Sequence, residues 1–101
     1  MIGLPPEHVE EYERLHAAVW PGVLERLRLS HVTNYSIYRF GDVLFSYLEY
    51  TGDDYDTDMA AIAADPTTQE WWAVCMPLQR AFPDRAPGEW WQSIDEVFHL
   101  D

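Results

Sequence analysis

Residues 32–50 read VTNYSIYRFGDVLFSYLEY, and their pattern is the strongest indication of the fold class. The segments 32–39 and 43–50 are rich in aromatic and β-branched residues and are separated by a Gly-Asp pair. Such runs around a short polar turn predict two antiparallel strands joined as a hairpin. Side chains alternate between the two faces of a strand. One face of the first strand therefore carries Tyr35, Ile37 and Arg39, and the other carries Asn34, Ser36 and Tyr38.

The flanking segments predict helices. Apolar residues recur at steps of three and four over residues 6–29, and Pro21 predicts a kink or a restart near Trp20 because proline removes a backbone donor. Residues 54–64 predict a short helix with an acidic start. A third helix is expected from residue 67 to about residue 80, with Thr67-x-x-Glu70 as a capping box.

The order of elements predicts a single α+β domain over residues 1–101. Residues 82–92 are expected to form a Pro/Gly-punctuated loop, and residues 93–100 a final strand. With one more strand in front, this order is the ferredoxin-like split βαβ arrangement. Residues 1–4 are short for that strand, so we expect the first strand to be short or missing.

Composition and charge exclude several classes of function. The chain is 48% hydrophobic and 15% aromatic, which excludes disorder. Eighteen acidic residues face six arginines and no lysine, for a net charge of −12, which disfavours nucleic acids and anionic membranes as partners. No apolar run suits a membrane span and no secretion signal is visible. The lone Cys75 forms no internal disulfide, so we expect a cytoplasmic protein.

Aromatic and titratable side chains mark a candidate site. Tyr12 and His16 stand four residues apart on the first predicted helix, which places them on one face. His16 could act as a general acid or base, because its ordinary pKa lies near neutral pH. An indole of the pair Trp71-Trp72 could stack on a sugar ring or a base, and the pair Trp90-Trp91 could form a pocket wall or a subunit contact. Tyr35 could point under the first helix. Ordinary packing of Tyr12, His16 and the tryptophans remains the alternative reading of this spacing.

The sequence offers no metal-binding pattern. Asp54, Asp56 and Asp58 imitate the opening of a calcium loop, but Met59 stands where glycine is required and Asp65 where a bidentate glutamate is required. The histidines lack the spacing of zinc ligands, and there is no second thiol. A glycine-rich phosphate loop and a nucleophile-elbow serine are also absent. We therefore expect no bound metal.

Four motifs together resemble the L-rhamnose mutarotase family over residues 5–101. They are EYERLHAAVWP (11–21), NYSIY (34–38), the pair Trp71-Trp72, and DEVFHL (95–100). The resemblance implies a ferredoxin-like fold of the dimeric α/β barrel type, and exchange between the α and β anomers of a 6-deoxy sugar without a cofactor. It further implies that His16 is the proton donor and that the sugar is bound by Tyr12, Tyr35, Trp71 and Trp72.

Mutarotation suits these residue types, since it needs an acid, a base and a platform for the ring but no redox group. L-rhamnose is implied by the resemblance alone, and L-fucose or another deoxy sugar stays open. Two other functions remain as alternatives on the same dimeric barrel: a cofactor-independent monooxygenase, or a small-ligand-binding module without catalysis. Aromatic side chains left on the sheet, such as Tyr38, Phe45 and Tyr47, predict a homodimer.

Overall fold

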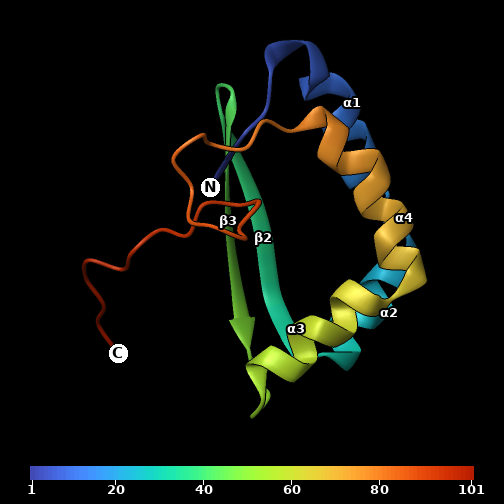
Figure 1. Cartoon of the computed structure of the whole chain (residues 1–101), viewed down its shortest axis with the longest axis vertical. Helices are drawn as coiled ribbons and strands as arrows, with labels where there is room; N and C mark the ends of the chain where they lie inside the picture. The colour runs from blue at the N-terminus through green and yellow to red at the C-terminus, as the bar shows by residue number, and fades with distance from the viewer.

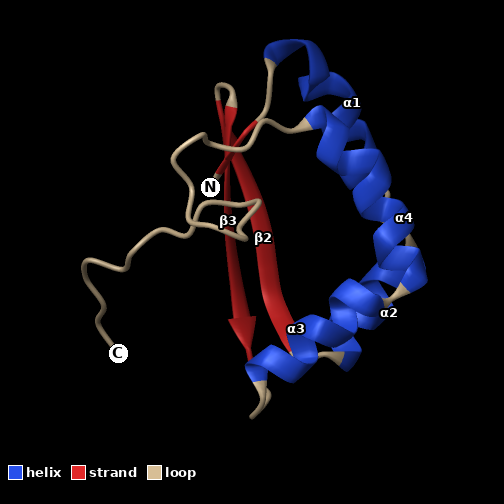
Figure 2. Ribbon diagram, in the orientation of Figure 1, coloured by secondary structure: helices blue, strands red, loops and turns tan.

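The computed structural model describes residues 1–101 and contains one antiparallel sheet with helices along one of its faces (Figure 1, Figure 2). The strands are β1 (Ile2–Gly3), β2 (Val32–Phe40) and β3 (Val43–Tyr50), in the order β1-β3-β2. The helices are α1 (Val9–His16), α2 (Pro21–Leu29), α3 (Tyr55–Ala64) and α4 (Pro66–Cys75), with 3₁₀ turns η1 (Pro6–His8) and η2 (Met76–Leu78). This α+β arrangement is consistent with a ferredoxin-like fold.

The predicted hairpin is confirmed. Strands β2 and β3 pair from Phe40 opposite Val43 outward, and Gly41 takes the positive φ of 60° that the tight turn requires. A bulge interrupts the pairing between Thr33 and Ser36. A bulge of this kind increases the local twist of a strand.

The helical segment 6–29 restarts where proline predicts it. Helix α1 ends at His16, and α2 begins with Pro21 in its first turn and Trp20 as the residue before it. Proline is favoured there because the first-turn backbone N–H groups have no partner within the helix. The break divides the segment into two short helices, α1 and α2.

The predicted capping box of α4 is wrong. Asp65 caps this helix, and its Oδ2 accepts hydrogen bonds of 2.8 Å from the Thr68 backbone N–H and from the Thr68 hydroxyl. Pro66 occupies the first turn, so the helix begins earlier than Thr67 and Asp65 takes the capping position. The helix also ends at Cys75, five residues before the predicted end, and continues only as the turn η2.

The first strand, β1, is short, as expected. Its residues pair with β3 on one side, and Gly3 and Met1 bond to later segments of the chain. Ile2 pairs with Leu44 and Gly3 with Val43 on the side of β3. On the other side, Gly3 exchanges two 2.8 Å backbone hydrogen bonds with Arg80. Met1 and Gln92 likewise exchange two bonds of 2.7 Å.

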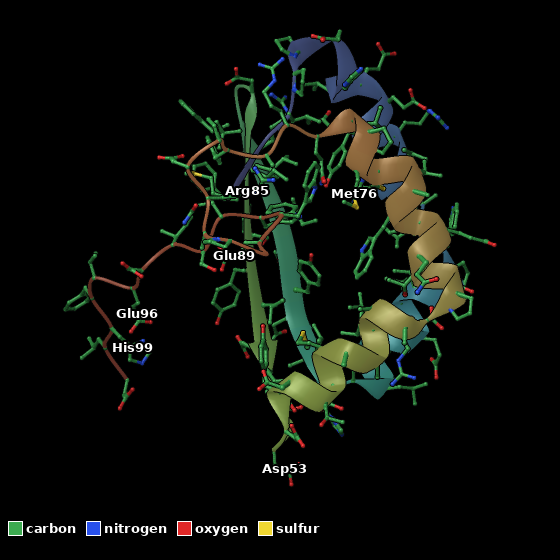
Figure 3. All side chains as sticks on the ribbon, viewed as in Figure 1. Asp53, Met76, Arg85, Glu89, Glu96 and His99 are labelled. Atoms are coloured by element: carbon green, nitrogen blue, oxygen red, sulfur yellow. The ribbon has the colours of Figure 1, made fainter.

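The predicted strand over residues 93–100 is wrong for the single chain. The last backbone hydrogen bonds of this segment join Gln92 to Met1, and residues 93–101 pair with no strand of the chain. The segment extends away from the body of the molecule, and Glu96 and His99 lie far from the sheet (Figure 1, Figure 3). Its apolar side chains are exposed, with Val97 at 96% and Phe98 at 80%.

The core is small and lies toward one end of the sheet. Ile2, Leu4 and Leu44 are almost completely buried there, and the core continues under the helices through Tyr12 and Trp71. Only 12 of 101 residues are buried, because the middle of the space between helices and sheet is open rather than filled. None of the helices has the length and apolar character that crossing a membrane demands.

Candidate active site

A cavity of about 610 Å³ occupies the space between the helices and the sheet. Twenty residues line it, and seventeen of them are hydrophobic. Met76, at the end of α4, points from the helix layer toward the strands (Figure 3). Only His16, Thr68 and Gln79 are polar residues, and the remaining hydrogen-bonding groups are the hydroxyls of Tyr12 and Tyr35 and the indole N–H groups of Trp71, Trp72, Trp90 and Trp91. An apolar pocket with few polar groups is typical of a small-molecule site.

His16 and Tyr12 form a stacked pair on α1. Their ring centroids lie 4.0 Å apart with an interplanar angle of 21°, as the four-residue spacing predicts. His16 Nδ1 lies 2.8 Å from the Tyr12 carbonyl oxygen. A carbonyl oxygen only accepts hydrogen bonds, so Nδ1 carries the proton and the neutral ring leaves Nε2 as an acceptor.

Burial keeps this histidine neutral. Desolvation lowers the pKa of His16 below its usual value of 6.5, and the bond to the carbonyl oxygen opposes that shift only in part. At neutral pH the ring is therefore uncharged, and its one free lone pair is on Nε2. That combination is what a general base requires.

The two tryptophans of α4 differ in their surroundings, since Trp71 is packed among other rings and Trp72 is more open to the cavity and solvent. Trp71 is only 6% exposed and meets the rings of His16 and Trp20 edge-on, at centroid distances of 5.1 and 5.2 Å. Trp72 is 38% exposed and also lines the cavity. Trp71 therefore supports the His16 ring from the side, whereas Trp72 offers a more open surface.

The Tyr12 hydroxyl is held by a side chain that no sequence pattern identified. Gln79 Nε2 donates a hydrogen bond of 3.1 Å to this hydroxyl, and the Trp90 indole N–H donates one of 2.7 Å to Gln79 Oε1. Desolvation raises the pKa of Tyr12 to about 12, so the phenol stays protonated. A lone glutamine after η2 belongs to no motif, and only the three-dimensional structure reveals its place.

Every predicted site residue lines the same cavity: Tyr12, His16, Tyr35, Trp71 and Trp72. Trp90 and Trp91 line it too, as predicted for a pocket wall. Desolvation raises the pKa of Tyr35, which reaches the cavity from β2. Trp20 is not a lining residue and instead packs against Trp71.

The remaining reactive or acidic residues considered in the sequence have structural roles. Cys75 is buried at the cavity wall, and desolvation raises the pKa of its thiol to about 11, so it stays an uncharged packing group. Asp54 caps α3, and Asp58 accepts hydrogen bonds from Tyr50 and His31. No group of three or more histidine, cysteine or acidic side chains is placed to hold a metal ion.

The fold and the cavity define a small α+β domain that holds an uncharged histidine and protonated phenols against an apolar pocket. The family model described as L-rhamnose mutarotase matches residues 1–100. The chain belongs to the L-rhamnose mutarotase family.

Individual relatives agree with this assignment. The chain is 35% identical over 100 residues to an L-rhamnose mutarotase of Phocaeicola vulgatus, covering 97% of this chain and 91% of that protein. It is 38% identical over 101 residues to one from Ligilactobacillus salivarius, covering 95% and 89%. A third, from Listeria monocytogenes, is 34% identical over 100 residues, covering 96% and 90%.

Proposed function

We propose that this protein is an isomerase that interconverts the α and β anomers of L-rhamnose. The His16–Tyr12 pair is the main support for the proposal: an imidazole whose Nδ1 is bonded to a carbonyl oxygen, which leaves Nε2 free, is stacked on a phenol at the wall of a cavity. Family membership supports the sugar, since the relatives at 34–38% identity bear the name L-rhamnose mutarotase. Neither observation depends on the other.

The proposed reaction moves two protons and breaks one bond. His16 Nε2 takes the proton of the C1 hydroxyl while the bond between C1 and the ring oxygen breaks, and the Tyr12 hydroxyl gives its proton to that ring oxygen. Rotation about the C1–C2 bond turns the other face of the aldehyde toward the new hydroxyl. Ring closure then returns one proton to Tyr12 and delivers the other to the former carbonyl oxygen. His16 is thus the proton donor in closure, as the family resemblance implies, and the acceptor in opening.

Tyr35 suits a role on the opposite side of the ring. It enters the cavity from the sheet, whereas Tyr12 and His16 enter from α1. A sugar between the two layers would therefore meet a hydrogen-bonding group on each face. Because its pKa is raised, Tyr35 remains a hydrogen-bond donor and can stabilise the charge that develops on the sugar oxygens during opening and closure.

The apolar lining matches the shape of a 6-deoxy sugar. Trp72 offers an indole face to the C–H side of the ring, and the aliphatic wall accepts the C6 methyl group. No step requires a cofactor, since the bonds that break are a hemiacetal C–O bond and O–H bonds.

Saturation-transfer NMR tests the proposal. The signal of one anomer is saturated and its transfer to the other is followed with and without protein, for L-rhamnose, L-fucose and D-glucose in parallel. We expect transfer to increase for L-rhamnose in proportion to protein. Unchanged transfer for every sugar, with binding retained, would favour the alternative of a non-catalytic binding module.

We also propose that the protein is a homodimer of the dimeric α/β barrel type. Its accessible surface is 7215 Å², about 1,300 Å² above the roughly 5,900 Å² expected for a chain of 11.8 kDa. A standard interface buries about 800 Å² per partner. The excess is therefore large enough to support a stable dimer.

The exposed apolar side chains indicate which surfaces would meet. Tyr38 and Tyr47 are 62% and 56% exposed on the sheet face that the helices leave open. The segment 93–101 extends on that open side, away from the helices, with an alternating apolar pattern that suits a strand (Figure 1). A second copy would cover the open face and supply the strand partner that the single chain lacks. Sedimentation equilibrium at tens of micromolar should give twice the chain mass, and a chain mass of 11.8 kDa would contradict the proposal.

A cytoplasmic location completes the proposal. It is supported by the lone buried thiol of Cys75, which suits a reducing compartment, and by the family's sugar substrate. Fractionation of the source cells should recover the protein with cytoplasmic markers.

A further inference from the structure

A three-member hydrogen-bond chain fixes the direction of the Tyr12 hydroxyl. The chain starts at the Trp90 indole, passes through the Gln79 side chain and ends at the Tyr12 oxygen, with lengths of 2.7 and 3.1 Å. An indole N–H can only donate. The amide oxygen of Gln79 must therefore face Trp90, which turns the amide NH₂ toward Tyr12.

This orientation decides what Tyr12 can do. Since the Tyr12 oxygen accepts a hydrogen bond from Gln79, its own hydrogen is not used in that bond and remains free for another acceptor. Tyr12 lines the cavity, so that acceptor can be a bound sugar. If the amide were reversed, the Tyr12 hydrogen would point at Gln79 instead, and a sugar oxygen would meet a lone pair.

The loop that carries Trp90 is itself fastened. Arg85 donates hydrogen bonds to the backbone oxygens of Phe82 and Glu89, at 3.0 and 2.6 Å. Its guanidinium lies 5.7 Å from the centre of the Trp90 ring, and Arg85 and Glu89 both lie on this loop beside the sheet (Figure 3). A stacked cation of this kind holds the indole in place.

We propose that Gln79, oriented by Trp90, is a positioning residue that makes the Tyr12 hydroxyl a hydrogen-bond donor to the sugar. The inference rests on the proposed mutarotase function and adds two residues, neither of which belongs to the motifs that identify the family. Gln79 and Trp90 act through Tyr12 and transfer no proton themselves.

Two substitutions at one position test the direction of the bond. Gln79→Glu keeps the shape and the acceptor for Trp90, but a carboxylate cannot donate, so it draws the Tyr12 hydrogen away from the sugar. Gln79→Leu removes both bonds and leaves the hydroxyl free to rotate. We expect kcat to fall by about 10- to 100-fold in Gln79→Glu, because a Tyr12 hydroxyl that points away from the sugar no longer stabilises the transition state by hydrogen bonding. We expect a smaller fall in Gln79→Leu and little change of KM in either.

Further variants separate positioning from structural support. Tyr12→Phe should lower kcat in the parent but add nothing in the Gln79→Glu background, because the donor is already lost there. Trp90→Phe keeps the ring and should lower kcat a few-fold by freeing the amide to flip. Gln69→Glu makes the same change on the exposed side of α4, where Gln69 bonds to the Ala63 carbonyl, and should leave exchange unchanged.

The outcomes are distinct. A parent that does not accelerate anomer exchange overturns the proposed function and this inference with it. If the parent is active, two results would overturn the positioning role alone. One is a Gln79→Glu variant at least as active as Gln79→Leu. The other is a Tyr12→Phe substitution that lowers kcat as much in the Gln79→Glu background as in the parent. The indole N–H resonance of Trp90 should move upfield in Gln79→Leu but stay hydrogen-bonded in Gln79→Glu, and thermal unfolding of each variant verifies that it is folded.

Discussion

Replacing His16 by alanine removes the only histidine at the cavity, and the structure predicts two separable consequences. General acid–base catalysis contributes about 10²–10⁴-fold, so kcat should fall by that factor, which corresponds to about 3–5 kcal/mol of activation free energy. The variant also loses the stack with Tyr12 and the edge contact with Trp71. Each aromatic pair contributes about 0.5–1.5 kcal/mol, so unfolding free energy should fall by roughly 1–3 kcal/mol.

His8→Ala is the matched control. His8 makes the same kind of bond, from Nδ1 to a backbone carbonyl, at 3.0 Å from the Leu78 oxygen, but it does not line the cavity. Its removal should cost stability without a fall in the rate of anomer exchange. Exchange is measured by saturation transfer on L-rhamnose, and stability by thermal unfolding of the same samples.

The pH dependence of the parent provides an independent check. Desolvation lowers the pKa of His16, and the base is the neutral form. Activity should therefore be full at neutral pH and should fall only as the pH drops through the lowered pKa, below the ordinary 6.5. His16→Ala should lack this acid limb. A His16→Ala variant that exchanges anomers as fast as the parent, or a His8→Ala variant that loses as much activity as His16→Ala, would exclude His16 as the catalytic base.

Three further predictions concern binding, helix capping and assembly. Trp72→Ala should raise the KM for L-rhamnose about 5- to 150-fold with kcat less affected, as measured by steady-state exchange. Trp71→Ala should instead lower the unfolding free energy by about 3–5 kcal/mol, as measured by chemical denaturation. The reverse pattern would show that Trp71 is the platform for the sugar. Asp65→Ala removes the cap of α4 and should cost about 0.5–2 kcal/mol in denaturant unfolding, so an unchanged midpoint would mean that Pro66 alone fixes the helix start. Phe98→Asp should shift the sedimentation profile toward monomer, and a parent-like profile would place the interface elsewhere.

The hairpin and the helix restart could be predicted because their causes are local. Alternation over β2 and β3, a Gly-Asp turn and the proline at residue 21 each act within a few neighbours. The same holds for the Tyr12–His16 stack, since helical geometry alone brings residues four apart together. The relative positions of residues within one helix or strand follow from the geometry of that element and do not depend on the rest of the fold.

The errors arise where a partner decides the outcome. Residues 93–100 have the pattern of a strand, but a strand forms only against another strand, and no strand of the single chain pairs with them. At α4 two capping signals compete, and the proline at the first turn favours Asp65 over Thr67. Gln79 has no pattern at all, because its role comes from meeting Tyr12 and Trp90 in space.

Acid–base catalysis at His16 underlies the proposed exchange of sugar anomers. The most direct measurement is two-dimensional exchange NMR on L-rhamnose at neutral pH, with the anomer-exchange rate recorded against protein concentration for the parent and for His16→Ala. We expect a rate that rises linearly with the concentration of the parent protein, with a slope at least about 100-fold smaller for the variant. A parent slope no greater than that of an unrelated protein at equal concentration would contradict the claim.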